Sequence, residues 1–384
     1  MMKVGVPREL SPGETRVALS PESAARFARL GVEVLFEKGL GSNCNWEDAL
    51  YEKAGAKAAK DRDQILAECD ILLRVQNAPP DEIPKLREGV FQVCFLDPFR
   101  NKEGVEALRK AGVSAFSMEM VPRSTYAQKM DALSSQHSIA GYAMVLLAAD
   151  RLDRVFPMMM TPAGNIGPAR VFIIGAGVAG LQAIATAKRM GARVEAFDTR
   201  PVVEEQVRSL GAKFVKIDLG ETGQTEQGYA KELTEEQKAL QLAGMKKVCS
   251  QSDVVITTAQ LFGRPAPVVV TKDMLSSMRP GAIVVDYAVE SGGNVEGSKP
   301  GEEVEVEGVR VLGFKNIPGR IAADASRMYA NNLYYFLEEF FDKEEKRFRF
   351  DPENEIYKAC LITEGGKVVN PMVLEIYGKE EGGA

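Results

Sequence analysis

Short apolar runs alternate with amphipathic segments along most of the chain. In the first third, β-branched and aromatic runs predict strands at residues 3–6, 32–36, 71–75, 90–96 and 113–116. Helices are predicted around residues 61–67 and 102–111. Another helix is predicted after Ser20, because Pro21 and Glu22 place a proline and an acidic residue in its first turn. This alternation is typical of a parallel α/β sheet.

A second series of the same kind begins near residue 140. Its predicted strands are residues 171–174, 194–197, 254–257, 282–286 and 309–312. The expected fold class is therefore α/β, with two doubly wound parallel-sheet, Rossmann-like domains. At 384 residues the chain is also long for a single hydrophobic core, which favours two domains.

The segment 322–341 is predicted to form a long helix that returns the chain to the first domain. Near one face it carries Ala325, Met328, Asn332, Phe336 and Phe340. We interpret this stripe as core that docks the helix on the first domain, and a stripe that contacts a cofactor is the alternative. The first domain is thus expected to be discontinuous, with residues 1–138 and 322–384, and the second to span residues 139–321. A ligand is expected in a cleft that separates the two domains, at the carboxyl ends of the strands.

A glycine pattern follows the first strand of the second series. Gly175, Gly177 and Gly180 have the G-x-G-x-x-G spacing at the point where a helix begins. In this pattern Gly175 permits the tight turn, Gly177 lets the backbone approach a pyrophosphate, and Gly180 lets the helix pack closely on the strand. The helix N-terminus then offers N–H groups to the phosphates, so the pattern predicts a bound dinucleotide.

Asp198 ends the next predicted strand, about 20 residues further on, where a carboxylate accepts hydrogen bonds from the adenosine ribose. A carboxylate at this position repels a ribose 2′-phosphate, so it favours NAD(H) over NADP(H). Thr199 and Arg200 follow directly, and the cation of Arg200 would soften that preference. We give more weight to Asp198, because it lies at the strand end itself.

Composition excludes several classes of protein. The formal net charge is −6 and no basic block occurs, so nucleic acid is not an expected partner. The longest apolar stretch, residues 139–149, is too short for a membrane span, and the N-terminus lacks the apolar core of a secretory signal. We therefore expect a cytoplasmic location. His137 is the only histidine and the five cysteines are scattered, which excludes a histidine-based metal site and a Ser-His-Asp hydrolase within one chain.

Two segments have the character of functional loops. Residues 217–236 are rich in glycine and charge, and we interpret them as a lid anchored by Tyr229, with a surface insertion as the alternative. Residues 121–137 follow a strand end and carry polar side chains suited to a nicotinamide carboxamide and its ribose: Arg123, Gln128, Asp131 and Ser134. For Asp131, the alternative is that it caps the helix that continues through Ser134.

Several motifs together resemble a known family. They are Pro122-Arg123 to Gly141-Tyr142, Phe156 to Thr161, Gly175 to Arg189, Arg16 to Pro21, Asp286 to Gly293 and Asn316 to Pro318. In this order they resemble the NAD(H)-binding domain I, or alpha-1 subunit, of proton-translocating NAD(P) transhydrogenase. The resemblance covers essentially the whole chain.

The resemblance implies a dimeric, peripheral component at the inner face of a membrane, part of a Si-/Re-specific transhydrogenase. Such a component holds NADH, whose hydride passes directly to NADP+ on a partner domain, while membrane-spanning subunits couple the transfer to proton translocation. By the same resemblance, Arg123, Gln128 and Asp131 act at the reacting nicotinamide and Ser134 helps to position it. Positions that match cofactor contacts of the family are Val178, Asp198, Thr199, Arg200, Gln260 and the pair Gly228 and Tyr229.

Two other functions stay open at this point. Alanine dehydrogenase resembles the same architecture but uses a lysine and a histidine, and neither occurs at the matching strand ends, residues 73–76 and 95–98. Arg16 resembles the arginine that binds the substrate carboxylate in those enzymes, so a vestigial oxoacid pocket is one possibility. A non-catalytic module that senses NADH is the other.

Overall fold

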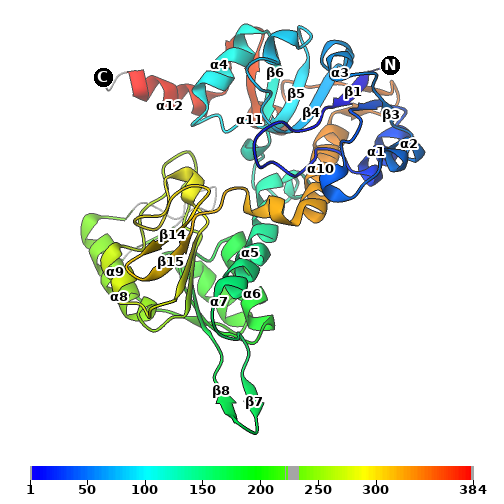
Figure 1. Ribbon diagram of the computed structural model, residues 1–384. Helices are drawn as coiled ribbons and strands as arrows, with labels where there is room; N and C mark the ends of the chain where they lie inside the picture. The colour runs from blue at the N-terminus through cyan, green and yellow to red at the C-terminus, as the bar shows by residue number, and fades with distance from the viewer. Residues whose placement is uncertain (1, 221, 224–232, 382–384) are drawn as a thin grey trace. The chain divides into compact units, whose positions relative to one another are not determined.

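The computed structural model describes residues 2–220, 222–223 and 233–381. The chain divides into two compact units, the first made of Met1–Gln136 with Gly319–Ala384 and the second of His137–Pro318 (Figure 1). We describe each unit by itself.

Unit 1 is built on an eight-stranded sheet with the order β19-β18-β6-β5-β4-β1-β2-β3. Its first six strands are parallel and run in the doubly wound order 3-2-1-4-5-6. They are β1 (Lys3–Val6), β2 (Glu33–Phe36), β3 (Lys57–Ala58), β4 (Ile71–Gln76), β5 (Phe91–Phe95) and β6 (Ser114–Ser117). At one edge, β18 (Leu361–Glu364) and β19 (Lys367–Val368) add antiparallel strands that the sequence did not predict.

The helices of unit 1 begin where the sequence places capping residues. Ser20 forms a capping box at the start of α1 (Pro21–Arg29), and Asp61 and Asn101 cap α3 (Arg62–Glu68) and α4 (Lys102–Lys110). The unit also contains α2 (Asp48–Lys53), α10 (Ala322–Glu339), α11 (Glu355–Cys360), α12 (Pro371–Glu381) and the hairpin of β16 (Phe341–Asp342) and β17 (Arg347–Phe348).

The apolar stripe of α10 lies in the core of unit 1, as predicted, with one error. Phe336 packs edge-on against Phe116 of β6, with ring centroids 5.5 Å apart. Ala325, Asn332 and Phe340 are buried as well. Met328 is 38% exposed, so its place in the stripe was wrong. The buried position one step further along the helix is Tyr329, whose hydroxyl donates to the carbonyl of Arg74.

Unit 2 has a seven-stranded sheet with the order β11-β10-β9-β12-β13-β15-β14, whose first six strands repeat the parallel order of unit 1. The strands are β9 (Arg170–Ile174), β10 (Arg193–Phe197), β11 (Lys213–Phe214), β12 (Val254–Thr257), β13 (Ile283–Asp286) and β15 (Val309–Leu312), with an antiparallel edge strand, β14 (Glu303–Val306). The helices are α6 (Val178–Arg189), α7 (Glu204–Ser209), α8 (Glu235–Cys249), α9 (Lys272–Ser276) and the portion of α5 (Ala132–Arg151) from His137 onward.

A two-stranded hairpin of β7 (Met159–Thr161) and β8 (Gly164–Ile166) extends from the body of unit 2 (Figure 1). No helix in the described part of the chain has the length and apolarity that crossing a bilayer requires. The five cysteines are all free and buried. Among the described residues no group of His, Cys, Asp and Glu side chains is placed to hold a metal ion.

Candidate dinucleotide site

Each sheet has a point where the strand order reverses, between β1 and β4 in unit 1 and between β9 and β12 in unit 2. The loops that leave neighbouring strands there run in opposite directions, so ligands of doubly wound sheets bind at such points. The two units share this framework. They differ in the side chains that the loops carry.

In unit 2 the turn after β9 has no room for side chains at two of its three glycines. Gly175 has φ +96°, and a Cβ on it would lie 2.6 Å from Oγ1 of Thr258. A Cβ on Gly180 would lie 1.9 Å from the carbonyl oxygen of Gly175. The turn therefore depends on glycine at both positions, as the spacing predicted.

The middle glycine is different, because space lies beside it. Gly177 is the N-cap of α6 and has no side chain to bond the first N–H groups of that helix. The nearest atom to a Cβ on Gly177 would be Nη2 of Arg200, at 3.9 Å. Val178, in the first turn, is 36% exposed. A helix N-terminus open in this way is suited to the phosphates of a dinucleotide.

Asp198 follows β10 directly and its carboxylate is fully engaged. Its Oδ2 accepts a hydrogen bond of 2.7 Å from the backbone N–H of Ala176, inside the glycine turn. The guanidinium of Arg200 donates to both oxygens, through Nε to Oδ1 at 2.9 Å and Nη2 to Oδ2 at 2.8 Å, and the backbone N–H of Arg200 donates to Oδ1 at 2.8 Å. The hydrogen bond to Asp198 raises the pKa of Arg200. The predicted ribose ligand thus also anchors the turn.

The loop after β12 borders the same turn and contains Gln260, which is half-buried. Thr258 joins the two loops, since its Oγ1 donates to the carbonyl of Gly175 at 3.0 Å. The buried side chain of Asn294 holds Ala259 from both sides, with Nδ2 donating to its carbonyl at 2.8 Å and Oδ1 accepting from its N–H at 3.1 Å. Neither Thr258 nor Asn294 was predicted as a site residue. For Asn294 the signal was its position next to the family motif ending at Gly293.

The predicted lid begins close to this site. Thr222 donates its hydroxyl to the carbonyl of Thr199 at 2.7 Å, which ties the segment to the residue after Asp198. The C-terminal end of the segment is the start of α8, capped by Thr234. Gly228 and Tyr229 lie outside the described residues.

In unit 1 the corresponding point is filled by charged side chains of the chain itself. The carboxylate of Glu9, which follows β1, accepts from the N–H groups of Val75 at 2.6 Å and Gln76 at 3.4 Å, at the end of β4. Nearby, Glu14 grips the guanidinium of Arg16 with both oxygens, at 2.8 and 2.7 Å. Arg16 is therefore occupied by a carboxylate of its own chain.

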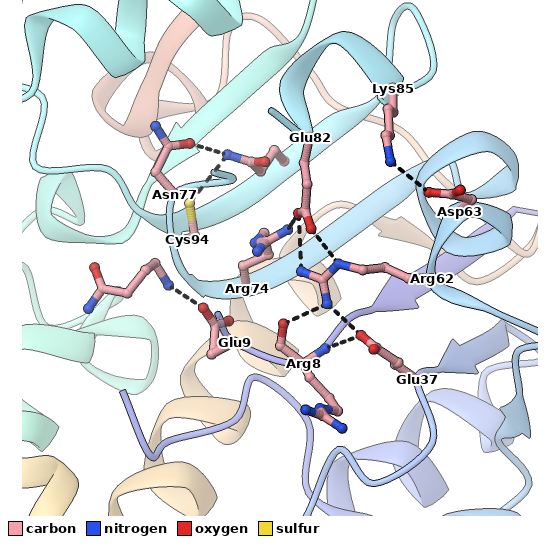
Figure 2. Close-up of polar contacts among 12 residues, drawn as sticks. Arg8, Glu9, Glu37, Arg62, Asp63, Arg74, Asn77, Glu82, Lys85 and Cys94 are labelled. Carbon is pink, nitrogen blue, oxygen red and sulfur yellow. Dashed lines mark hydrogen bonds and ion pairs between the residues drawn. The ribbon is translucent and has the colours of Figure 1, made fainter. Parts of the chain in front are cut away.

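An ion-pair network supports this filling (Figure 2). Arg74, 1% exposed, donates to Glu82 at 2.9 Å. Glu82 also pairs with Arg62, whose guanidinium continues to Glu37 at 2.5 Å. Charges buried in pairs like these are costly to separate. The reversal point of unit 1 is thus closed by internal contacts, whereas that of unit 2 is formed by glycines.

Glu9 makes the stability of unit 1 depend on pH. Burial, opposed by the charge of Arg74, raises the pKa of Glu9 from 4.5 to about 7. The folded chain then keeps a proton that the unfolded chain releases, so the free energy of unfolding falls as pH rises from 4.5 to about 7, by about 3 kcal/mol. We expect Glu9→Gln to remove this fall. Urea unfolding at several pH values, followed by fluorescence of the single tryptophan, Trp46 of unit 1, measures it. Glu103→Gln, at an exposed carboxylate, should keep the wild-type slope; a Glu9→Gln variant with that slope would contradict the assignment.

The predicted nicotinamide loop lies in unit 1, before α5. Arg123 and Gln128 are exposed, the latter at the start of a 3₁₀ turn, Gln128–Met130. Asp131 accepts from the N–H of Ser134 at 2.8 Å and from its hydroxyl at 2.6 Å. Asp131 therefore caps α5, the alternative considered from the sequence, and Ser134 is its partner.

Asn332 of α10 fixes the shape of this loop. Its Nδ2 donates to the carbonyl of Lys129 at 2.9 Å, and its Oδ1 accepts from the hydroxyl of Ser135 at 2.7 Å. Ala127 and Met130 are buried between the exposed positions. The loop is thus held in place while Gln128 stays exposed.

Comparisons with known proteins agree with this architecture. The N-terminal and C-terminal domain models of the alanine dehydrogenase/PNT family match residues 5–140 and 144–371. The first of the two parts of NAD(P) transhydrogenase subunit alpha from Rhodospirillum rubrum is 44% identical over 377 residues, which cover 96% of this chain and 98% of that protein. Its counterpart from Rickettsia prowazekii is 40% identical and covers 98% of both chains.

Solved structures give the same result. A transhydrogenase from Sinorhizobium meliloti is similar with a TM-score of 0.84 at 43% identity, covering 96% of this chain and 99% of that one. An L-alanine dehydrogenase structure, 23% identical, shares the fold with a TM-score of 0.81 over 98% of this chain and 99% of its own.

Proposed function

This chain belongs to the alanine dehydrogenase/PNT family, and on that premise we propose that it is the NAD(H)-binding component of a proton-translocating NAD(P)+ transhydrogenase. The observation that carries the proposal is the turn at Gly175, Gly177 and Gly180 beside Asp198, which has the space and the donors that a dinucleotide needs. The transhydrogenase relatives, at 44% and 40% identity over nearly their full length, favour this member of the family over an alanine dehydrogenase.

In this proposal the chain binds and orients NADH and excludes water. NADH itself supplies the hydride, which goes to NADP+ on a partner domain. Transfer between two nicotinamides needs alignment at close distance and no proton transfer, which suits a site without histidine or metal ligands in its predicted set. We propose that unit 2 holds the adenosine half and that Arg123, Gln128 and Asp131 act at the nicotinamide end. Coupling to proton translocation would belong to membrane subunits, with this chain peripheral at the inner face.

One experiment separates the functions that remain open. The chain is titrated with NADH, and a soluble NADP(H)-binding domain is then added while reduction of a nicotinamide analogue is followed. Fast reduction that requires the second domain supports the transhydrogenase. NADH binding without any rate enhancement would favour a sensing module, and robust NAD-dependent oxidation of alanine by the chain alone would favour an alanine dehydrogenase.

We also propose that the chain forms a homodimer through the β7–β8 hairpin. The hairpin carries exposed apolar side chains, with Met158 63%, Met160 73% and Ile166 44% exposed. Exposed methionines on an extended arm are typical of a surface that another protein covers. Because the same hairpin occurs on each copy, two chains can exchange equivalent contacts about a two-fold axis.

We expect Met160→Glu to convert the dimer to a monomer, with at least a tenfold weaker association, because it would place a charge in an apolar interface (about 1.4 kcal/mol or more). Light scattering during size-exclusion chromatography measures the mass. Leu240→Glu, at a 48% exposed leucine of α8 in the same unit, is the matched control and should leave the mass unchanged. A wild-type monomer, or a dimeric Met160→Glu variant, would contradict this interface.

A further inference from the structure

The carboxylate of Asp198 has no acceptor position left for a ligand in the observed arrangement. A carboxylate accepts about four hydrogen bonds, and here Arg200 supplies three and Ala176 one, at 2.7 to 2.9 Å. The two side chains are 6% and 14% exposed, so solvent screens the pair little. Asp198 is therefore part of a nearly neutral pair.

This pairing changes what the site offers to an adenosine ribose. A ribose with two free hydroxyls brings donors, which can replace those of the guanidinium. A 2′-phosphate brings acceptors and a charge near −2, which the carboxylate repels and the guanidinium attracts. Because Nη2 of Arg200 lies close to the Gly177 turn, the guanidinium stays beside the ligand in either case.

We propose that Arg200 is a second specificity-determining residue of the dinucleotide site: it holds Asp198 and offsets its charge, so that the pair sets how strongly the site rejects a ribose 2′-phosphate. This inference rests on the proposed binding of NAD(H). It predicts that removing either member changes the selectivity between NADH and NADPH, and in opposite directions.

The test measures dissociation constants for NADH and NADPH by nicotinamide fluorescence in the wild-type chain, Arg200→Met, Asp198→Asn and the double variant. Methionine keeps the aliphatic stem and removes the charge. We expect the ratio of the NADPH constant to the NADH constant to rise at least about tenfold in Arg200→Met, since a bare carboxylate then faces the phosphate. In Asp198→Asn the ratio should fall at least about tenfold, and the double variant should lose that gain.

Arg208→Met is the matched control. It removes a cation of the same unit that pairs with Glu204 of α7, and it should leave the ratio unchanged. If Arg200→Met does not fold, Arg200→Gln replaces it, with the same expected rise. An unchanged ratio in the neutral variant, or the same ratio in Asp198→Asn and the double variant, would overturn the inference while NADH binding stands. Failure of the wild-type chain to bind NADH would instead overturn the proposed function, and the inference with it.

Discussion

Gly180→Ala is expected to abolish measurable NADH binding, a loss of at least 100-fold in affinity, and to destabilise unit 2. The added methyl would lie 1.9 Å from the backbone oxygen of Gly175, which is fixed by the strand before it and by Thr258. Neither atom belongs to a flexible side chain, so α6 would have to move away from β9. Such a movement would take the helix N-terminus away from the phosphates. NADH fluorescence titration and thermal unfolding measure the two effects.

Gly177→Ala separates the two effects. Its methyl has no neighbour closer than 3.9 Å and its φ of −79° suits any residue, so the fold should keep its stability. The methyl would enter the space beside the phosphates, so NADH affinity should fall at least about tenfold. Gly167→Ala, with nothing within 4 Å, is the control and should be silent in both measurements. Normal NADH binding by Gly180→Ala would show that the turn does not hold the dinucleotide.

Gln128→Asn is expected to lower the rate of hydride transfer to the partner nucleotide about 100-fold, while the dissociation constant of NADH stays within about threefold. Gln128 is exposed on a turn that Asn332 holds in place, so shortening its side chain alters its reach and not the loop. Its proposed contact is with the reacting ring, whereas the phosphate contacts lie in unit 2. Stopped-flow transfer with the NADP(H)-binding domain, beside a direct titration, gives both quantities.

Thr125→Ser is the control for this variant, because Thr125 is exposed on the same loop and has no proposed role. Its rate and affinity should equal those of the wild type. Equal losses of rate and affinity in Gln128→Asn would remove Gln128 from the reacting end of the site. A rate that falls equally in Thr125→Ser would point to the loop as a whole.

The parts of the fold that the sequence predicted are those with strong local patterns. The runs before Gly175 and Asp198 became buried parallel strands, β9 and β10, and the glycine spacing predicted the turn between β9 and α6. The antiparallel edge strands β14, β18 and β19 were missed, because segments of two to four residues have too few positions to show a period. Met328 was assigned to the buried face because a spacing of three from Ala325 fits a helical stripe as well as the spacing of four that Tyr329 has.

The site could be predicted as a set of residues but not as a set of partners. Asp198 was expected to await the ribose, yet Arg200 and Ala176 occupy its oxygens. Contacts such as Glu9 with Val75, 66 positions apart, leave no mark in a local pattern, because nothing in the sequence fixes which strand end a carboxylate will meet. The capping of α5 by Asp131 was visible as an alternative, since a cap and a ligand contact call for the same residue type.

The repeated strand order of the two sheets bears on how such proteins are classified. A search by backbone shape alone would mark a nucleotide crevice in both halves, since both have the same reversal of strand direction. What distinguishes them is whether the turn after the first strand carries glycines or glutamates. In bilobed proteins of this kind, the inventory of side chains at the reversal points is therefore a better guide to ligand number than the number of matching scaffolds.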